Sequence, residues 1–288
     1  MAKKIIISAE TGSDIPQELA ARLGILLIPM HVSMGDKTLD DGAFPPEDVC
    51  AYYDRTGKVP TTSGSTPYDF TCVYDEIFAA DPDARILHLA YSAVTTCSYH
   101  SCQLAVEGKP YESRVRIVDT RHVSVGQCAV VLAVREWLEA HPEATLEEAV
   151  AAAEIIGQQT KMCFIPKNLD YLRAGGRVSN AVALVGNLLQ LHPCIEIIED
   201  KLIAGKKYRG KLPVQAPLLL REFAAKHSLR KDHIYFINTP YMEEAVRTAL
   251  DAEAAALGFR KITWIKTGCV ITCHGGPGAF GIVGVSGK

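Results

Sequence analysis

The segment KIIISAETGSDIPQELAARLGILLIPM, residues 4–30, contains two apolar runs separated by a helix signal. The run over residues 4–8 is rich in isoleucine and predicts a buried strand. Ser-Asp-Ile-Pro at 13–16 is typical of a helix start, and Gly24 of a helix end. A second strand is expected over 26–34. This order of strand, helix and strand predicts two parallel strands joined by a helical crossover.

The alternation continues through the first half of the chain. Helices are expected after Pro46, after Pro67 and over 125–140, and strands over 85–90 and 115–118. Thr145 and Glu148 form a capping box for a further helix, which Gly157 is expected to end. These elements predict an α/β domain over residues 1–160, with a mainly parallel sheet flanked by helices.

The pattern changes beyond residue 160. Two helices are expected on either side of a Gly-Gly pair, and a hairpin is expected around Asp200 and Lys201. Further strands and helices then alternate: the expected helices cover 168–174, 180–191, 215–226 and 242–257, and the expected strands 194–199, 202–207, 233–238, 260–266 and 281–285. We interpret residues 161–288 as an α+β domain with a smaller, mixed or antiparallel sheet.

Composition narrows the classes of function. The formal net charge of -3 argues against nucleic-acid binding, which usually requires a surplus of basic residues. The apolar runs are shorter than a signal sequence or a membrane span requires, so we expect a cytoplasmic protein. Nine cysteines occur without a CxxC pair, which is typical of reduced and mostly buried thiols.

The sequence ITCHGGPGAF, residues 271–280, permits three chemical interpretations. A Cys273–His274 dyad is disfavoured, because neighbours in an extended segment point to opposite faces. A metal site with Cys269 lacks the paired spacing of zinc ligands. The glycines fit no nucleotide-binding fingerprint, which leaves either a loop that passes close to another element or a ligand, or a tight turn into the last strand. His274 is a candidate hydrogen-bond donor to an anion.

Two hydroxyl-rich stretches follow predicted strands. VPTTSGSTPYDF, residues 59–70, contains Thr62 and Ser63, and AYSAVTTCSYHS, residues 90–101, contains Thr96. Hydroxyls at a helix start suit an anion, although the same residues are ordinary N-caps. Both stretches are expected at the carboxyl edge of the parallel sheet, where open α/β sheets bind ligands.

Two arginines are further candidates. Arg177 follows Gly175 and Gly176 in RAGGRVSN, where it can reach an anion or an acidic partner or remain solvated. Arg209 lies in GKKYRGK, a basic cluster on the predicted hairpin that is either a solvated tip or a docking patch. Residue spacing does not separate these alternatives.

Taken together, the motifs resemble the DegV family, bacterial proteins that bind a fatty acid and present it to a separate fatty acid kinase. The resemblance covers essentially the whole chain and rests on seven stretches in order: ETGSDIP, DKTLDDG, VPTTSGSTPYDF, TTCSYHS, IVDTRHVSVG, LDYLRAGGRVSNAVALVGNLLQLHP and CHGGPGAFGI. This sequence differs from the family pattern at Glu10, at Gly64 with Ser65, at Cys97 and at Thr272.

The resemblance implies roles for individual residues. The fatty acid carboxylate would be held by residues from both halves of the chain, and the kinase or the head-group region would be contacted by the arginines. The implied ligand-binding residues are Thr62, Ser63, Thr96, His274, Gly275 and Arg177, and the implied partner-binding residue is Arg209. No cofactor, no metal and no catalytic residue is implied.

The resulting hypothesis is a non-catalytic lipid carrier of phospholipid synthesis. It would hold a long-chain fatty acid in a buried tunnel between its domains, partly lined by residues 180–191, and present the carboxylate to a fatty acid kinase, with transient contact to a membrane. Two alternatives remain. One is a hydrolase or acyltransferase that uses His274, although no GxSxG motif is present. The other binds a different small carboxylate or phosphorylated ligand.

Overall fold

The computed structural model describes residues 5–167, 169–178 and 191–287. The chain divides into two compact units. Unit 1 comprises the residues up to Ala43 together with Thr62–Gln158, and unit 2 comprises Phe44–Thr61 together with the residues from Gln159 onward. The division after residue 158 lies beside the boundary expected near 160, whereas Phe44–Thr61 groups with the second half of the chain.

Unit 1 is built on a parallel sheet of four strands in the order β2-β1-β6-β7. Its strands are β1 (Ile5–Glu10), β2 (Ile25–Ile28), β6 (Arg85–Ala90) and β7 (Val115–Asp119). Helix α1 (Gln17–Leu23) joins β1 to β2 after the short 3-10 helix η1 (Thr11–Ser13). Gly24 ends α1 in a left-handed conformation, as expected from the sequence. The predicted parallel sheet is therefore confirmed.

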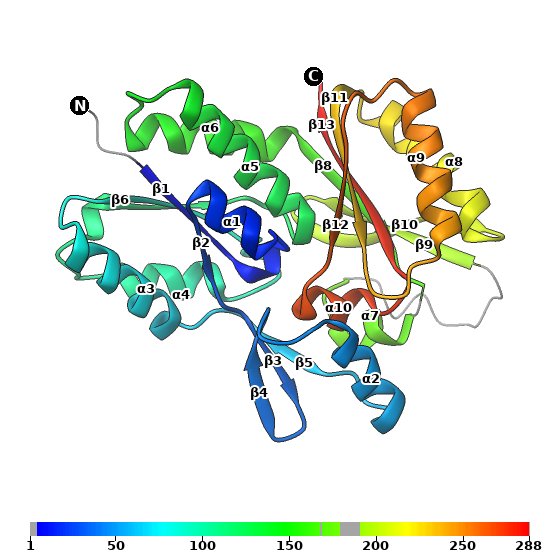
Figure 1. Ribbon diagram of the computed structural model, residues 1–288, viewed down its shortest axis with the longest axis horizontal. Coiled ribbons are helices and arrows are strands. Elements are labelled where there is room, and N and C mark those ends of the chain that lie inside the picture. Colours follow the sequence, from blue (N-terminus) through cyan, green and yellow to red (C-terminus); the bar gives the residue numbers. More distant parts are fainter. Residues whose placement is uncertain (1–4, 168, 179–190, 288) are drawn as a thin grey trace. The chain divides into compact units, whose positions relative to one another are not determined.

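Helices cover both faces of this sheet (Figure 1). On one face lie α3 (Pro67–Ala80) and α4 (Ser98–Val106), and on the other α5 (Ser124–Ala140) and α6 (Leu146–Gln159). The 3-10 helix η2 (Glu112–Arg114) precedes β7. The predicted capping box between Thr145 and Glu148 opens α6. Gly157 does not end α6, because it is a buried helical residue packed against the Thr120 carbonyl.

The single strand expected over residues 26–34 is wrong. Pro29 separates β2 from β3 (His31–Met34), because proline cannot donate to a strand ladder. Strand β3 instead pairs with β4 (Lys37–Asp40) in an antiparallel hairpin. With β5 (Thr61–Ser63) they form a small sheet in the order β4-β3-β5.

Unit 2 contains a mixed sheet in the order β10-β9-β8-β13-β11-β12. Its strands are β8 (Thr160–Ile165), β9 (Leu191–Ile198), β10 (Lys201–Arg209), β11 (Leu229–Asn238), β12 (Ile262–Lys266) and β13 (Phe280–Ser286). Only β11 and β12 run parallel within the described sheet. The mixed sheet was predicted, but with six strands it is larger than the parallel sheet rather than smaller. One strand that was not predicted is β8, which lies at the expected domain boundary.

The helices of unit 2 lie in two places (Figure 1). Helices α8 (Leu212–Lys226) and α9 (Glu244–Ala256) pack together on one side of the sheet, where Leu220 and Leu250 join Phe236 in the core. The short helices α7 (Leu169–Gly175) and α10 (Cys269–Gly275) gather with α2 (Glu47–Thr56) at one end of the strands. The helix expected over 180–191 falls almost wholly outside the described residues.

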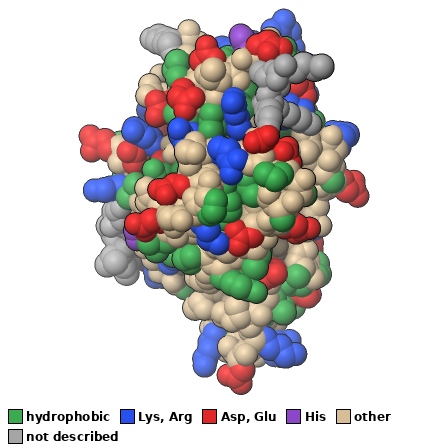
Figure 2. Space-filling model, turned by 90° about the vertical axis from the view of Figure 1, so that its left-hand side faces the viewer, with side chains coloured by type: hydrophobic (Ala, Val, Ile, Leu, Met, Phe, Trp, Pro, Cys, Tyr) green, Lys and Arg blue, Asp and Glu red, His purple; other side chains and the backbone are tan. Residues whose placement is uncertain are grey.

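The surface carries charges of both signs. On the face drawn in Figure 2, Lys and Arg side chains are interspersed with Asp and Glu, in keeping with the net charge of -3. Among the described helices, none combines the length and apolar character that crossing a bilayer requires. All nine cysteines lie in the described ranges, and none of them forms a disulfide.

Candidate functional site

The first hydroxyl-rich stretch leads from β5 into α3. Thr62 and Ser63 lie on β5, where Thr62 is partly buried and Ser63 exposed. Thr66 is the N-cap of α3, because its hydroxyl accepts from the Asp69 amide while Asp69 accepts from the Thr66 amide. The capping interpretation is therefore confirmed for Thr66, and the ligand-binding roles of Thr62 and Ser63 stay predictions.

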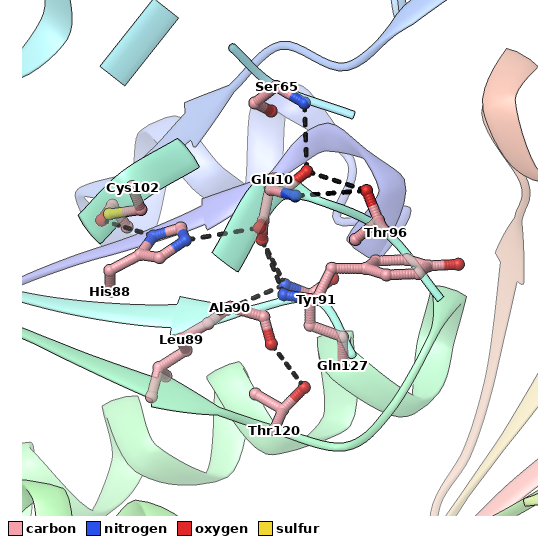
Figure 3. A network of polar contacts seen from close by, with 12 residues as sticks. Glu10, Ser65, His88, Leu89, Ala90, Tyr91, Thr96, Cys102, Thr120 and Gln127 are labelled. Carbon is pink, nitrogen blue, oxygen red and sulfur yellow. Dashed lines mark hydrogen bonds and ion pairs between the residues drawn. The ribbon is translucent and has the colours of Figure 1, made fainter. Parts of the chain in front are cut away.

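The two hydroxyl-rich stretches meet at Thr96 (Figure 3). The Ser65 amide donates to Ser98 Oγ at 3.0 Å, and Ser98 Oγ lies 3.1 Å from Thr96 Oγ1. A Cβ atom at Gly64 would overlap the Thr96 hydroxyl oxygen and lie 2.5 Å from that of Ser98. We call Gly64, Ser65, Thr96 and Ser98 the hydroxyl cluster. The second stretch follows β6 of the parallel sheet, whereas the first lies on β5 of the β4-β3-β5 sheet, so the expectation that both follow parallel strands was wrong for the first.

A buried carboxylate supports the loop that carries Thr96 (Figure 3). Glu10, at the end of β1, has no exposed surface and accepts from the Tyr91 amide at 2.9 Å and from Gln127 Nε2 at 2.8 Å. Its other oxygen lies 3.4 Å from His88 Nε2. Burial alone would raise the pKa of Glu10, but His88 and these donors lower it below its ordinary value.

Two histidines of unit 1, His31 and His88, differ in their burial and partners; an apolar strand context predicts a satisfied core residue for each. His88 is fully buried, and its Nδ1 lies 3.0 Å from Ser8 Oγ, which confirms the expectation. His31 is only partly buried and bridges two carboxylates: Nδ1 lies 3.0 Å from Asp40 Oδ1, and Nε2 lies 2.9 Å from Asp69 Oδ2. His31 therefore links the β3–β4 hairpin to the first turn of α3.

In unit 2, the segment before the Gly-Gly-Pro-Gly loop is the helix α10 and not an extended strand. The expectation of an extended segment was wrong. Cys273 and His274 still point apart, because successive helical residues are rotated by roughly 100°. Thr272 is fully buried, and its hydroxyl is used inside the helix, where it donates to the Gly268 carbonyl at 2.7 Å.

The surroundings of His274 keep its imidazole neutral. Although His274 as a whole is partly exposed at the end of α10, its Nδ1 is buried and lies so close to Gly175 that a Cβ atom there would overlap it. Burial lowers the pKa of His274 to about 4, and the positive charge of Arg177 adds to this effect. Arg177 donates to the Gly175 carbonyl at 2.7 Å. The structure thus brings the predicted residues His274 and Arg177 together, both within unit 2.

The glycine-rich loop passes close to another element. Gly275 is buried at the end of α10, and Gly276 follows with a positive φ of 68°. A Cβ atom at Gly276 would lie 2.8 Å from the ring of Tyr171 on α7. Tyr171 is fully buried and packs against Tyr53 of α2 at a ring distance of 4.8 Å. The loop is therefore both a turn into β13 and a close approach to Tyr171.

Arg209 is exposed at the end of β10, opposite Leu191 of β9. In the same strand, Lys206 pairs with Glu222 of α8 at 2.7 Å, so part of the basic hairpin is neutralised. This position leaves the Arg209 side chain accessible to a partner. Its predicted role stays a prediction.

Two further features lie apart from these residues. An open groove of about 850 Å³ on unit 1 runs beside α4 and β7, lined in part by Tyr99, Leu104 and Ile117, and none of the predicted site residues borders it. Within the described ranges, no three His, Cys, Asp or Glu side chains converge in a way that could hold a metal ion.

Sequence reasoning missed the partners that position Thr96. Ser98 lies two residues after Thr96, yet its role depends on the Ser65 amide, which is 33 residues away in the chain. In the sequence, Glu10 stands out only as a difference from the family pattern. An acidic residue at the end of an otherwise apolar strand was the available signal, because a buried carboxylate must be paired.

Comparisons with known proteins agree on one family. Residues 4–286 match the family model described as "Uncharacterised protein, DegV family". The chain is 30% identical over 288 residues to a "Fatty acid-binding protein" of Thermotoga maritima, with 96% of each chain covered. It is 29% identical to a "DegV domain-containing protein" of Deinococcus radiodurans, covering 96% of this chain and 97% of that protein.

A solved structure gives the same result. The chain is similar to "Fatty Acid Binding of a DegV family Protein from Thermus thermophilus", with a TM-score of 0.86 and 30% identity. This similarity covers 98% of this chain and 99% of that one. The protein described by these two units therefore belongs to the DegV family.

Proposed function

We propose that this protein binds a long-chain fatty acid without transforming it and presents the carboxylate to a fatty acid kinase. In this proposal Thr62, Ser63, Thr96, His274, Gly275 and Arg177 receive the head group, and Arg209 contacts the kinase. The observation that carries the proposal is the hydroxyl cluster, which places neutral donors at the carboxyl end of a parallel sheet.

The relatives support the ligand class. The Thermus thermophilus structure is described as fatty acid binding, and the Thermotoga maritima relative is named a fatty acid-binding protein. Both are 30% identical to this chain over nearly its whole length. The assignment to a kinase system rests on the sequence motifs shared with the family.

Physical chemistry supports neutral donors for such a ligand. A carboxylate that loses water needs hydrogen bonds, which hydroxyls can supply. Burial of a chain of about sixteen carbons contributes on the order of 10 kcal/mol before ordering costs, at about 0.8 kcal/mol per methylene. The acyl chain therefore supplies most of the binding affinity, and the hydrogen bonds to the head group mainly orient the carboxylate. Neutral donors also leave a carboxylate oxygen reactive toward a phosphoryl donor.

The ligand is tested by extraction. The purified protein would be denatured in organic solvent and the extract measured by mass spectrometry, beside a blank of unrelated protein from the same host. We expect stoichiometric long-chain fatty acid. If none is extracted, and if delipidated protein also binds none of the C12 to C20 acids supplied to it, the proposal fails.

The kinase step is tested separately. A fatty acid kinase with ATP and palmitate would be assayed for acyl phosphate with and without this protein. We expect product only when the protein is present, and a lower rate with Arg209→Ala at unchanged palmitate affinity. Lys201→Ala, at the start of the same strand, is the matched control for removing a positive charge.

A further inference from the structure

Two backbone amides fix the direction of two hydrogen bonds in the hydroxyl cluster. The Ser65 amide donates to Ser98 Oγ at 3.0 Å, and the Ser98 amide donates to Thr96 Oγ1 at 3.3 Å. A hydroxyl has one proton to donate and two lone pairs. The two amides therefore fix one acceptor position on each hydroxyl, and the remaining bond of 3.1 Å between Ser98 Oγ and Thr96 Oγ1 can run either way.

Burial decides between the two directions. Ser98 is fully buried, whereas Thr96 is partly exposed. If Thr96 donated to Ser98, the Ser98 proton would need another acceptor inside the protein, and an unmade buried hydrogen bond is costly. If Ser98 donates to Thr96, the buried Ser98 hydroxyl has a partner for its proton as well as for its oxygen. The second direction is therefore the more stable one.

The favoured direction makes Thr96 a donor only. Its oxygen then accepts from the Ser98 amide and from the Ser98 hydroxyl, so both lone pairs are occupied. Thr96 can therefore interact with a ligand only by donating its hydroxyl proton. Because consecutive hydrogen bonds polarise one another, this proton is a stronger donor than that of an isolated threonine.

Gly64 allows the hydroxyls of Thr96 and Ser98 to lie close together. Its Cβ position is filled by the Thr96 and Ser98 hydroxyls, so any side chain at this position would separate them. The backbone at Gly64 does not have a positive φ, so the glycine is required by space and not by conformation. The amide of Ser65 is equally specific, because proline at this position would remove the first donor.

We propose that the Ser65 amide, Ser98 and Thr96 form a one-way hydrogen-bond relay that selects an ionised carboxylate over a neutral head group of the same chain length. The inference rests on the proposed function, because it assigns Thr96 to the ligand. Ser98 and Gly64 are positioning residues that act through Thr96. The relay favours an acceptor with full negative charge, since charge-assisted hydrogen bonds are about twice as strong as neutral ones.

The test compares two ligands that differ only in the head group. Delipidated wild-type protein and variants would be titrated with palmitate and with 1-hexadecanol at pH 8. For Ser98→Ala we expect the palmitate affinity to fall about tenfold and the hexadecanol affinity to change less than about twofold, as the loss of one strong hydrogen bond predicts. Gly64→Ala should act in the same direction.

Two comparisons separate the relay from general damage. Ser65→Pro removes the amide proton that Ser65→Ala retains, so palmitate selectivity should be lower in Ser65→Pro than in Ser65→Ala. Thr95→Ala removes a neighbouring hydroxyl that bonds to the Ser92 carbonyl outside the cluster, and it should keep wild-type selectivity. Thermal unfolding of each variant would establish that it is folded.

Each outcome is decisive. If Ser98→Ala lowers the affinity for both ligands equally, or for neither, the relay is wrong while fatty-acid binding stands. If wild-type protein binds neither ligand, the proposed function itself fails, and the ligand role of the relay fails with it. The first bond of the relay, from the Ser65 amide to Ser98 Oγ, also has a check without ligand. Amide exchange at Ser65 should be slow in the wild type and fast in Ser98→Ala.

Discussion

At residue 274 the chain places an imidazole whose pKa lies at about 4, because burial and the charge of Arg177 both disfavour its protonated form. The neutral ring can therefore donate only one proton at pH 7. A bound carboxylate would supply the missing negative charge and raise this pKa. Ligand binding near pH 5 should then be accompanied by proton uptake.

The protonation state of His274 can be measured directly. In an NMR titration of ligand-free protein, we expect the His274 ring signals to change with a midpoint near 4, and to move upward in Arg177→Gln because the repelling charge is gone. Since the folded pKa lies below the ordinary value of 6.5, the unfolded chain takes up this proton first. His274 therefore costs stability as the pH falls from 6.5 toward 4, and His274→Asn should remove that part of the pH dependence. A midpoint at or above 6.5 would contradict the assignment.

The buried carboxylate of Glu10 also has a lowered pKa. Burial opposes its ionisation, but His88, the Tyr91 amide and Gln127 lower its pKa below 4.5. This stabilisation is complete above pH 4.5 and is lost as the pH falls through the folded pKa. We expect Glu10→Gln to reduce the free energy of unfolding at pH 7 by about 3 kcal/mol, because it breaks a buried pair.

A surface pair provides the control for Glu10. Glu147 pairs with Arg116 at 2.9 Å, and both side chains are exposed. Glu147→Gln should change the free energy of unfolding by less than about 1 kcal/mol. Urea unfolding at pH 7 would measure both variants. Equal losses would show that burial of the Glu10 carboxylate has no special energetic role.

At the scale of elements, His31 joins a hairpin to a helix start. Its ring lies between Asp40 of β4 and Asp69 in the first turn of α3, directly after the stretch that contains Thr62 and Ser63. Burial would lower the pKa of His31, but the bonds to Asp69 and Asp40 outweigh it and raise the pKa above 6.5. The protonated ring therefore holds the two elements together.

This contact predicts a loss of stability at alkaline pH. A raised folded pKa gives stabilisation that is complete below 6.5 and disappears as the pH rises through the folded value. His31→Asn should flatten the pH dependence of urea unfolding between pH 6 and 8.5. His100→Asn, on the exposed start of α4, is the matched control and should leave it unchanged. An unaltered profile in His31→Asn would rule out the contact as a source of stability.

The predicted elements succeeded where local signals were strong. The capping box at Thr145, the glycine that ends α1 and the strand over 85–90 were all correct, because neighbouring residues decide them. The helix α10 was missed, because its seven residues contain β-branched and cysteine side chains with weak helix propensity. Packing against α7 and α2 stabilises this helix, and such contacts are invisible in a local pattern.

In the molecule as a whole, the two units differ in how far their sheets could be predicted from the sequence. The parallel sheet of unit 1 is readable from sequence, because each strand is followed by its helix. The sheet of unit 2 joins β8 to β13, strands from opposite ends of that half of the chain. Pairing between strands that are far apart in the chain cannot be predicted from local sequence patterns. The sheet of unit 2 was therefore predicted to be smaller than it is.

The fold class, the family and the positions of the hydroxyl, imidazole and guanidinium groups could be predicted from composition, periodicity and motif order, which need no folded chain. How those groups are used depends on tertiary contacts. The tertiary structure brought the Ser65 amide to Ser98 and Thr96, and it buried Glu10 beside His88. The physical reason is that protonation state and hydrogen-bond direction depend on burial and on partners far away in the chain, which exist only once the chain has folded.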